Sequence, residues 1–211
     1  ACEKTLEDGT LRTLREQSIM ARQESLIQWA SNHRRHISLE AKEFDWSWKS
    51  GIPLFDFEVR VNIDGFAGVG RGSDPGETTA LTKAIAEALE RAVCASRKIP
   101  SVGVAAHTVS HLARENARLE ALERHAFNQH LLNRWNFIPT DEVRASTSLP
   151  AMRFFRMRLP EPYHAILCFL SEAETKFIGL SCGTDILAAL DKSALEVLRN
   201  HAAFLADPAA Y

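Results

Sequence analysis

One stretch constrains the fold more than any other part of the sequence. From Leu54 to Ile63 apolar residues alternate with polar or charged ones, which is the period of a β-strand with two different faces. Asp64-Gly65 follows directly and is a strong signal for a two-residue hairpin. The sequence therefore predicts two antiparallel strands, with the second running from Phe66 to Gly72. The apolar face carries Phe55, Phe57, Val59, Val61 and Ile63, and the opposite face carries Asp56, Glu58, Arg60 and Asn62.

A long amphipathic helix is predicted after this hairpin, from Glu77 to Ser96, because its apolar pairs recur at helical spacing and form a wide stripe. A helix of this kind packs across a sheet. Apolar periodicity also predicts further helices and strands along the chain. We therefore expect an α/β (α+β) fold with helices packed on a mainly antiparallel sheet. The other predicted helices are Thr10–Arg35, Val109–Leu132 and Ile186–Phe204; the strands are Met152–Leu159, His164–Ser171 and Lys176–Ser181, with a strand or loop at Ile37–Ile52.

Length and composition indicate one ordinary globular domain. The chain has 211 residues, of which 45% are hydrophobic and 25% charged. We expect an N-terminal helical segment over residues 1–50 and an α/β core over residues 51–211. The net charge of -2 gives no reason to expect nucleic acid or a membrane as partner, and there is no apolar run long enough to span a bilayer. Four widely spaced cysteines fit reduced thiols, so the predicted location is the cytoplasm.

The strings Glu87-Ala-Leu-Glu90-Arg91 and Glu120-Ala-Leu-Glu123-Arg124 are identical, and both fall on predicted helices. Positions i, i+3 and i+4 lie on one side of a helix, so each copy gathers two carboxylates and one guanidinium. Such carboxylates can hold hard cations, and the arginines can contact phosphates. The glycines between Gly68 and Gly72 would let backbone N–H groups approach phosphates as well. The alternative is that both strings are ordinary surface ion pairs made of good helix formers.

With these motifs the chain resembles the YcaO family. Its members show a Gly-Lys-Gly-like segment and a helix ending in Glu-x-x-Glu-Arg, then Ser-Asn-Gly-x-Ala-x-Gly and a second Glu-x-x-Glu-Arg. The first pair is matched here by Gly70-Arg71-Gly72 and the string at Glu87, and the second by the segment Ser101–His107 and the string at Glu120. A third family element, a strand and then a helix with Ala-x-x-Glu, is similar to Gly179–Gly183 followed by Ala189 to Glu196. The resemblance covers roughly residues 54–200.

The resemblance implies an ATP- and Mg²⁺-dependent enzyme that phosphorylates a backbone amide oxygen of a peptide, as in the formation of azolines, thioamides or amidines. It implies a peptide or protein substrate, delivered by a partner protein, and it allows a homo-oligomer. No catalytic residue is assigned by it. The implied magnesium ligands are Glu87, Glu90, Glu120 and Glu123; Arg91 and Arg124 would steady the phosphates, and Arg71 and Ser101 would line the nucleotide.

Three positions depart from the family pattern. Val102 stands where the family has a metal-binding Asn, His107 replaces a Gly, and His125 replaces an acidic residue. Valine cannot ligate a cation. A non-catalytic relative that binds a partner subunit is therefore the main alternative, and whether catalysis survives these changes stays open.

Two further alternatives use other residues. The segment Phe55–Ala92 loosely resembles a double-stranded-RNA-binding domain, but a third strand is not apparent and its helix starts with Gly76-Glu77 instead of with lysines. A transition-metal site is the second alternative, built from the histidines His107, His111, His125 and His130.

Overall fold

The computed structural model describes residues 26–33, 37–45, 54–140, 151–172 and 174–206. The described part contains two antiparallel sheets. The first has the order β1-β2-β3, with β1 Ile37–Asp45, β2 Phe55–Ile63 and β3 Phe66–Asp74. The second has the order β4-β5-β6-β7, with β4 Ile138–Pro139, β5 Arg153–Met157, β6 His164–Glu172 and β7 Thr175–Gly183. The long helices are α3 Glu77–Arg97, α4 Ser110–Leu132 and α5 Ile186–Ala206, and residues 26–32 form a short helix.

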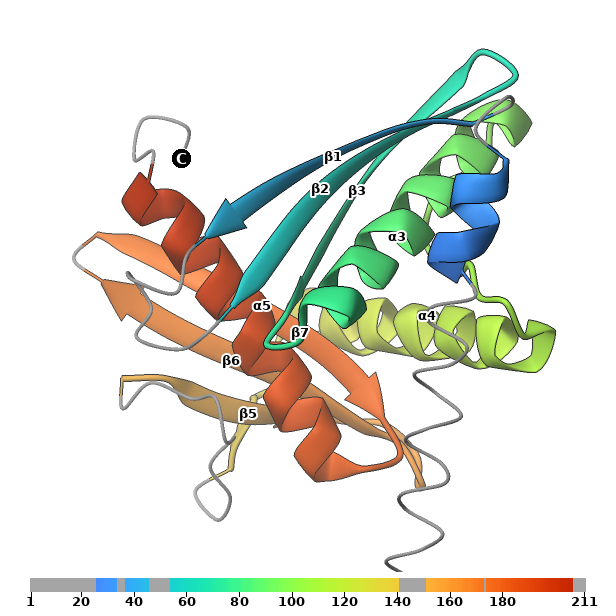
Figure 1. The fold of residues 1–211 in the computed structure, drawn as a ribbon. Helices are drawn as coiled ribbons and strands as arrows, with labels where there is room; N and C mark the ends of the chain where they lie inside the picture. The colour runs from blue at the N-terminus through green and yellow to red at the C-terminus, as the bar shows by residue number, and fades with distance from the viewer. Residues whose placement is uncertain (1–25, 34–36, 46–53, 141–150, 173, 207–211) are drawn as a thin grey trace, which may run out of the picture.

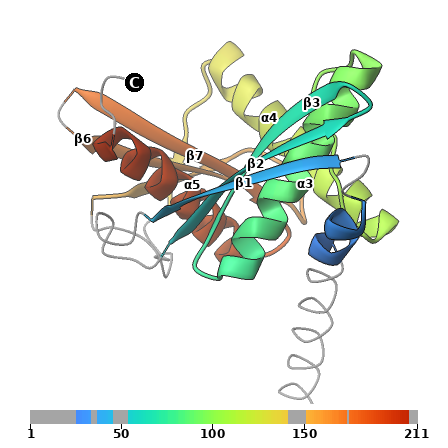
Figure 2. The ribbon, with the colours of Figure 1, turned by 45° about the horizontal axis from the view of Figure 1, so that its top comes forward.

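The helices cover the sheets in layers (Figure 1). α3 packs on one face of the first sheet, where Val59 and Val61 are buried beneath it. α5 packs on one face of the second sheet and α4 on the other. α5 also contacts β3, so it lies between the two sheets, as a second view confirms (Figure 2). The predicted fold class, helices packed on antiparallel sheets, is therefore confirmed.

The hairpin between β2 and β3 forms where the sequence predicts it. Ile63 pairs with Phe66, and the two residues between them, Asp64 and Gly65, have φ values of 52° and 85°. Positive φ at both central residues defines the type I′ turn that matches the twist of paired strands. Local sequence chemistry is thus enough to specify this part of the fold.

The glycines of β3 have a different role from the one suggested by the sequence. A Cβ on Gly70 would lie 2.2 Å from the backbone nitrogen of Ala88, and one on Gly68 or Gly72 would lie 2.1 Å from a carbonyl oxygen of α3. These glycines therefore let β3 and α3 approach each other closely. The close contact is with a helix instead of with phosphate groups.

The structure contains an internal repeat that the sequence analysis missed. β2, β3 and α3 form a hairpin–helix unit, and β6, β7 and α5 form a second one. Each element of the second unit begins 109 residues after its counterpart, so Phe55 corresponds to His164, Phe66 to Thr175 and Glu77 to Ile186. The two identical strings lie on α3 and α4, which are not counterparts in this repeat. Their identity therefore does not come from the repeated architecture.

Some predictions lie partly outside the described residues. Of the helix predicted over Thr10–Arg35, residues 26–32 are helical, and residues 10–25, 34 and 35 lie outside the described part. The region Ile37–Ile52 contains β1, which pairs with β2 along its whole length. β1 is a third strand that precedes α3, so the objection that the RNA-binding alternative lacks such a strand was wrong. The two-residue β4 was not predicted.

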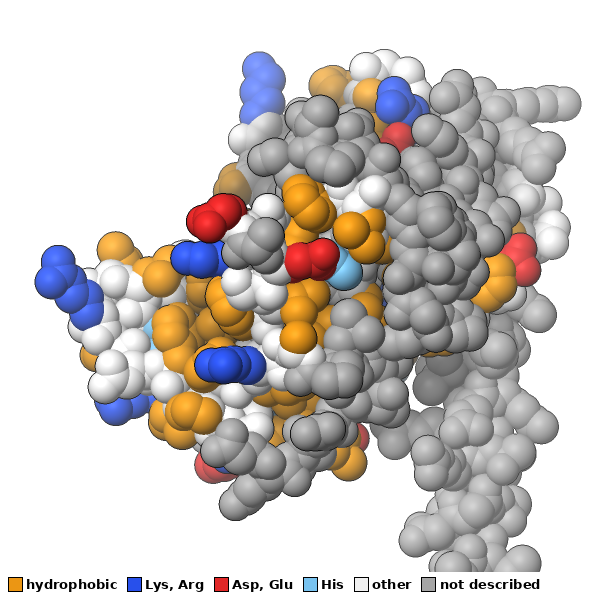
Figure 3. Space-filling model, turned by 90° about the vertical axis from the view of Figure 1, so that its left-hand side faces the viewer, with side chains coloured by type: hydrophobic (Ala, Val, Ile, Leu, Met, Phe, Trp, Pro, Cys, Tyr) orange, Lys and Arg blue, Asp and Glu red, His pale blue; other side chains and the backbone are white. Residues whose placement is uncertain are grey.

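Two other observations concern the surface. No helix within the described ranges is both long and apolar enough to cross a membrane. Among the described residues on the face drawn in Figure 3, Lys and Arg side chains are scattered among apolar and acidic ones and form no basic stripe. A basic stripe is the electrostatic footprint of a nucleic-acid-binding surface, and the start of α3 carries the exposed acidic residue Glu77. Charge thus remains the argument against the RNA-binding alternative.

Candidate functional site

A cavity of about 630 Å³ lies among β3, α3, α4 and α5. It is lined by five basic and six acidic side chains, which come from both hairpin–helix units and from α4. Six of the eight residues predicted from the sequence line it, namely Arg71, Glu87, Glu90, Glu120, Glu123 and Arg124. The other two, Arg91 and Ser101, are not among its lining residues. Tertiary structure therefore brings both identical strings to one cavity.

Backbone N–H groups hold four of the lining carboxylates. Glu87 accepts a hydrogen bond from the N–H of Arg71 (2.7 Å). In the second unit the corresponding residues make the same bond, since Glu196 accepts one from the N–H of Leu180 (2.7 Å). Glu90 accepts from Ala106 (2.6 Å), and Glu120 accepts from Gly103 (3.1 Å). A carboxylate has two oxygens, so one such bond orients the group and leaves a second oxygen to meet other partners. The glutamates are thus oriented by the fold itself.

Arg91 supports the site from outside the cavity. Its guanidinium donates to the carbonyl oxygen of Val69 (2.7 Å) and also pairs with the carboxylate of Glu87. In the second unit Asn200 donates to the carbonyl of Ile178 in the equivalent way (3.4 Å). Arg91 therefore ties α3 to β3 and neutralises part of the charge of Glu87.

Two of the lining glutamates have raised pKa values. Burial raises the pKa of Glu90 to about 7, and repulsion from Glu120 and Glu87 adds to the effect, while the N–H of Ala106 and the charge of Arg91 oppose it. Burial also raises the pKa of Glu123, although Lys192 acts in the opposite direction. The carboxylates of α3 and α4 therefore lie close enough to repel one another. A bound cation would relieve this repulsion.

The raised pKa of Glu90 predicts a pH effect on stability. In the unfolded chain Glu90 titrates near its ordinary value of 4.5, whereas in the folded chain it keeps its proton up to about pH 7. Between these values the folded state binds more protons, so the free energy of unfolding falls as pH rises from 4.5 through 7. We expect Glu90→Gln to flatten this decline in metal-free protein, as measured by urea unfolding at pH 5, 6, 7 and 8. Parallel pH curves for wild type and Glu90→Gln would contradict the assignment.

α5 contributes a third set of charges that was not predicted as part of the site. Asp191, Lys192, Glu196 and Arg199 all line the cavity. Glu196 is the counterpart of Glu87, and Lys192 is the counterpart of Lys83, which also lines the cavity. Aligning the two hairpin–helix patterns at their 109-residue offset would have found both residues. In the sequence, Glu196 stands out only as the end of the third family element.

The described residues of the cavity wall present carboxylates and cationic side chains to the same space. Among the residues that the structure describes, no three His, Cys, Asp or Glu side chains form a ready-made metal site. Mg²⁺ is usually held by one or two carboxylates together with phosphate oxygens, and it does not need a cage made wholly of protein. Val102, at the position of the family's Asn, has 53% of its surface exposed and supplies no ligand.

The histidines and cysteines are explained by packing or exposure. His130 is buried; its Nδ1 lies 2.9 Å from the carbonyl of Ala126, and its Nε2 accepts from the N–H of Arg158. His107, His111 and His125 are exposed, so the described residues do not support the transition-metal alternative. The described cysteines, Cys94, Cys168 and Cys182, are buried. Burial raises the pKa of each thiol, to about 12 for Cys168 and to about 11 for Cys182.

Comparison with solved structures identifies the architecture. The structure of YcaO from Methanopyrus kandleri, bound with AMPPCP and Mg²⁺, superposes on 90% of this chain and 68% of its own with a TM-score of 0.69, at 13% sequence identity. The chain has a YcaO-like fold. The E. coli microcin synthetase McbBCD complex with bound pro-MccB17 matches 53% of this chain and 33% of its own, with a TM-score of 0.44 and 20% identity, and the assignment does not rest on it. No family model and no curated protein matches the sequence.

The YcaO-like fold confirms the resemblance drawn from the motifs. At 13% identity the comparison establishes a shared arrangement of helices and sheets. Function has to be argued from the residues of the cavity, because one fold hosts many activities. The geometry described above supplies that argument.

Proposed function

We propose that this chain binds ATP with magnesium in the cavity and uses it to activate a backbone amide of a peptide or protein by phosphorylating the amide oxygen. The observation that carries the proposal is the mixed charge of the lining: carboxylates from α3, α4 and α5 face the same space as Arg71, Lys83, Arg124, Lys192 and Arg199. Carboxylates suit metal ions, and guanidinium and ammonium groups suit phosphates. A metal-bound triphosphate presents both kinds of group at once.

The size and the known relative support the same conclusion. Binding cavities for small molecules and cofactors usually measure about 300–1,000 Å³, and this cavity falls within that range. The Methanopyrus kandleri YcaO structure, which shares the fold, contains an ATP analogue and Mg²⁺. In the proposal, Glu87, Glu90, Glu120, Glu123 and Glu196 offer oxygens to magnesium, and Ser101 stays outside the nucleotide contacts.

The arginines and lysines would carry the electrostatic part of the reaction. The amide oxygen attacks the γ-phosphorus, a new P–O bond forms, the bond to the β-phosphate oxygen breaks and ADP leaves. Negative charge on the transferring group is stabilised by fixed cations, and Arg71 and Arg124 lie on the cavity wall for this role. Magnesium supplies further charge neutralisation when bound. The modified carbonyl then has a good leaving group.

The attacking nucleophile comes from the substrate or from a second molecule in this proposal. The described cysteines are buried thiols with raised pKa values, so they are not thiolates ready to attack an activated carbonyl. A peptide with its own Cys, Ser or Thr side chain is one substrate class that meets this requirement. A partner protein would deliver it.

The proposal predicts magnesium-dependent ATP binding by the purified chain. Isothermal titration should show ATP binding with MgCl₂ and much weaker binding with EDTA, and candidate peptides should stimulate ADP release. If the chain binds ATP but no candidate peptide stimulates ATP hydrolysis, the non-catalytic alternative is supported instead. No ATP binding, combined with stabilisation by double-stranded RNA, would overturn the proposal.

A further inference from the structure

Asp56 is a fully buried carboxylate at the edge of the cavity wall. It lies on β2 and is 0% exposed, although the alternating pattern places it on the polar face of the strand. Its Oδ1 accepts a hydrogen bond from the hydroxyl of Ser73 (2.5 Å), and its Oδ2 accepts one from Nη2 of Arg71 (3.2 Å). Both partners line the cavity, whereas Asp56 does not.

Arg71 is therefore held at two points. Its backbone N–H donates to Glu87 on α3, and its guanidinium pairs with Asp56 on β2. The Arg71 side chain is 33% exposed, so part of it meets the cavity while another part is fixed by the buried carboxylate. A long, flexible side chain is thereby restricted before any ligand arrives.

Packing alone does not explain a charged residue at this position. Removing a carboxylate from water is costly, and buried ion pairs are often no more stabilising than apolar residues of the same size. A buried acid beside a cavity arginine is, however, an efficient way to fix the direction of the guanidinium. We propose that Asp56 is a positioning residue that orients Arg71 toward the phosphate groups of the nucleotide. This inference rests on the proposed function.

The first test compares ATP with adenosine. Asp56→Asn keeps the size of the side chain and an oxygen that can accept the Ser73 hydroxyl, but it removes the charge that holds Arg71. We expect affinity for Mg·ATP to fall about tenfold, in line with the loss of one charge-assisted hydrogen bond, while affinity for adenosine stays the same. An equal loss for both ligands would mean a general structural role, and unchanged or tighter Mg·ATP binding would also overturn the inference.

Asp64→Asn is the matched control, because Asp64 is an exposed turn residue whose positive φ suits Asn. It should bind both ligands as wild type does. If wild type binds no ATP, the proposed function fails. If wild type binds ATP and Asp56→Asn binds it equally well, only the positioning role fails.

A double-mutant cycle with Arg71→Gln shows whether Asp56 acts through Arg71. If it does, adding Asp56→Asn to Arg71→Gln should cause no further loss of Mg·ATP affinity. The fold gives a second readout that needs no ligand. Arg71→Gln alone leaves the buried carboxylate without its guanidinium and should lower the melting temperature more than the double variant does. Additive losses of affinity would overturn the inference.

Discussion

Glu87→Gln combined with Glu120→Gln should abolish the magnesium-dependent stabilisation of the chain by ATP. In wild type, ligand at a hundred times its Kd adds about 2.7 kcal/mol to the free energy of unfolding, which raises the melting temperature by about 5 °C or more in a chain of this size. The double variant should show no shift in thermal unfolding with Mg·ATP. The reason is that the two glutamates lie on different helices, α3 and α4, and both face the cavity where the metal-bound phosphates would sit.

These substitutions should leave the apo fold nearly intact. A glutamine oxygen can still accept the N–H of Arg71 at position 87 and that of Gly103 at position 120. The lost ion pair between Glu87 and Arg91 is half-exposed and so contributes little.

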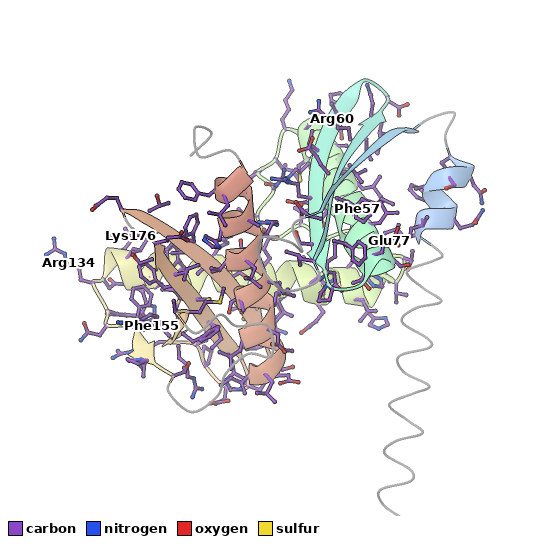
Figure 4. The ribbon with its side chains drawn as sticks, turned by 60° about the vertical axis from the view of Figure 1, so that its left-hand side comes forward. Phe57, Arg60, Glu77, Arg134, Phe155 and Lys176 are labelled. Atoms are coloured by element: carbon purple, nitrogen blue, oxygen red, sulfur yellow. The ribbon has the colours of Figure 1, made fainter. Side chains whose placement is uncertain are left out.

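Glu77→Gln is the matched control for the glutamate variants, because this exposed residue lies in the first turn of α3 and does not line the cavity. In Figure 4 it lies beside the first sheet, away from Phe155 and Lys176 of the second. The control should keep the full stabilisation by Mg·ATP. A double variant that is stabilised as strongly as this control would refute the metal-binding role.

Gly70→Ala should destabilise the protein severely. The new methyl group would lie 2.2 Å from the nitrogen of Ala88 and 2.3 Å from the oxygen of Ala84, and both atoms belong to the backbone of α3. Backbone cannot turn aside as a flexible side chain can, so the helix has to move away from the sheet. Overpacking typically costs about 1–3 kcal/mol, and we expect at least the upper value here, which corresponds to a fall in melting temperature of about 6–12 °C.

Gly183→Ala is the control for this effect. A Cβ on Gly183 would lie 3.6 Å from the oxygen of Asp185, which is an ordinary van der Waals contact. Gly179→Ala should behave like Gly70→Ala, because a Cβ there would lie 2.1 Å from the oxygen of Ser193 in the second unit. A Gly70→Ala protein that keeps its melting temperature but loses ATP affinity would restore the phosphate-binding interpretation of these glycines.

The candidate site was only partly predictable from the sequence. Glu87 and Glu120 were predicted because they belong to two identical strings at helical spacing. The resemblance of these strings to a known motif pair then indicated a role in binding magnesium. Asp56 was assigned to the polar face of its strand, but alternation cannot say whether that face meets water or another part of the protein. Its burial depends on Arg71 and Ser73, which lie on the neighbouring strand.

The sequence by itself determined the local structure: the type I′ hairpin, the amphipathic helices α3, α4 and α5, and the antiparallel strands follow from turn chemistry and from apolar periodicity, which act between near neighbours. Only the tertiary structure decided which charges share a cavity. It brought Lys192 and Glu196 of α5 to the glutamates of α3 and α4, and it placed α3 on the glycines of β3. The physical reason is that these contacts join segments far apart in the chain, and their energies depend on burial and close packing, which no local pattern encodes.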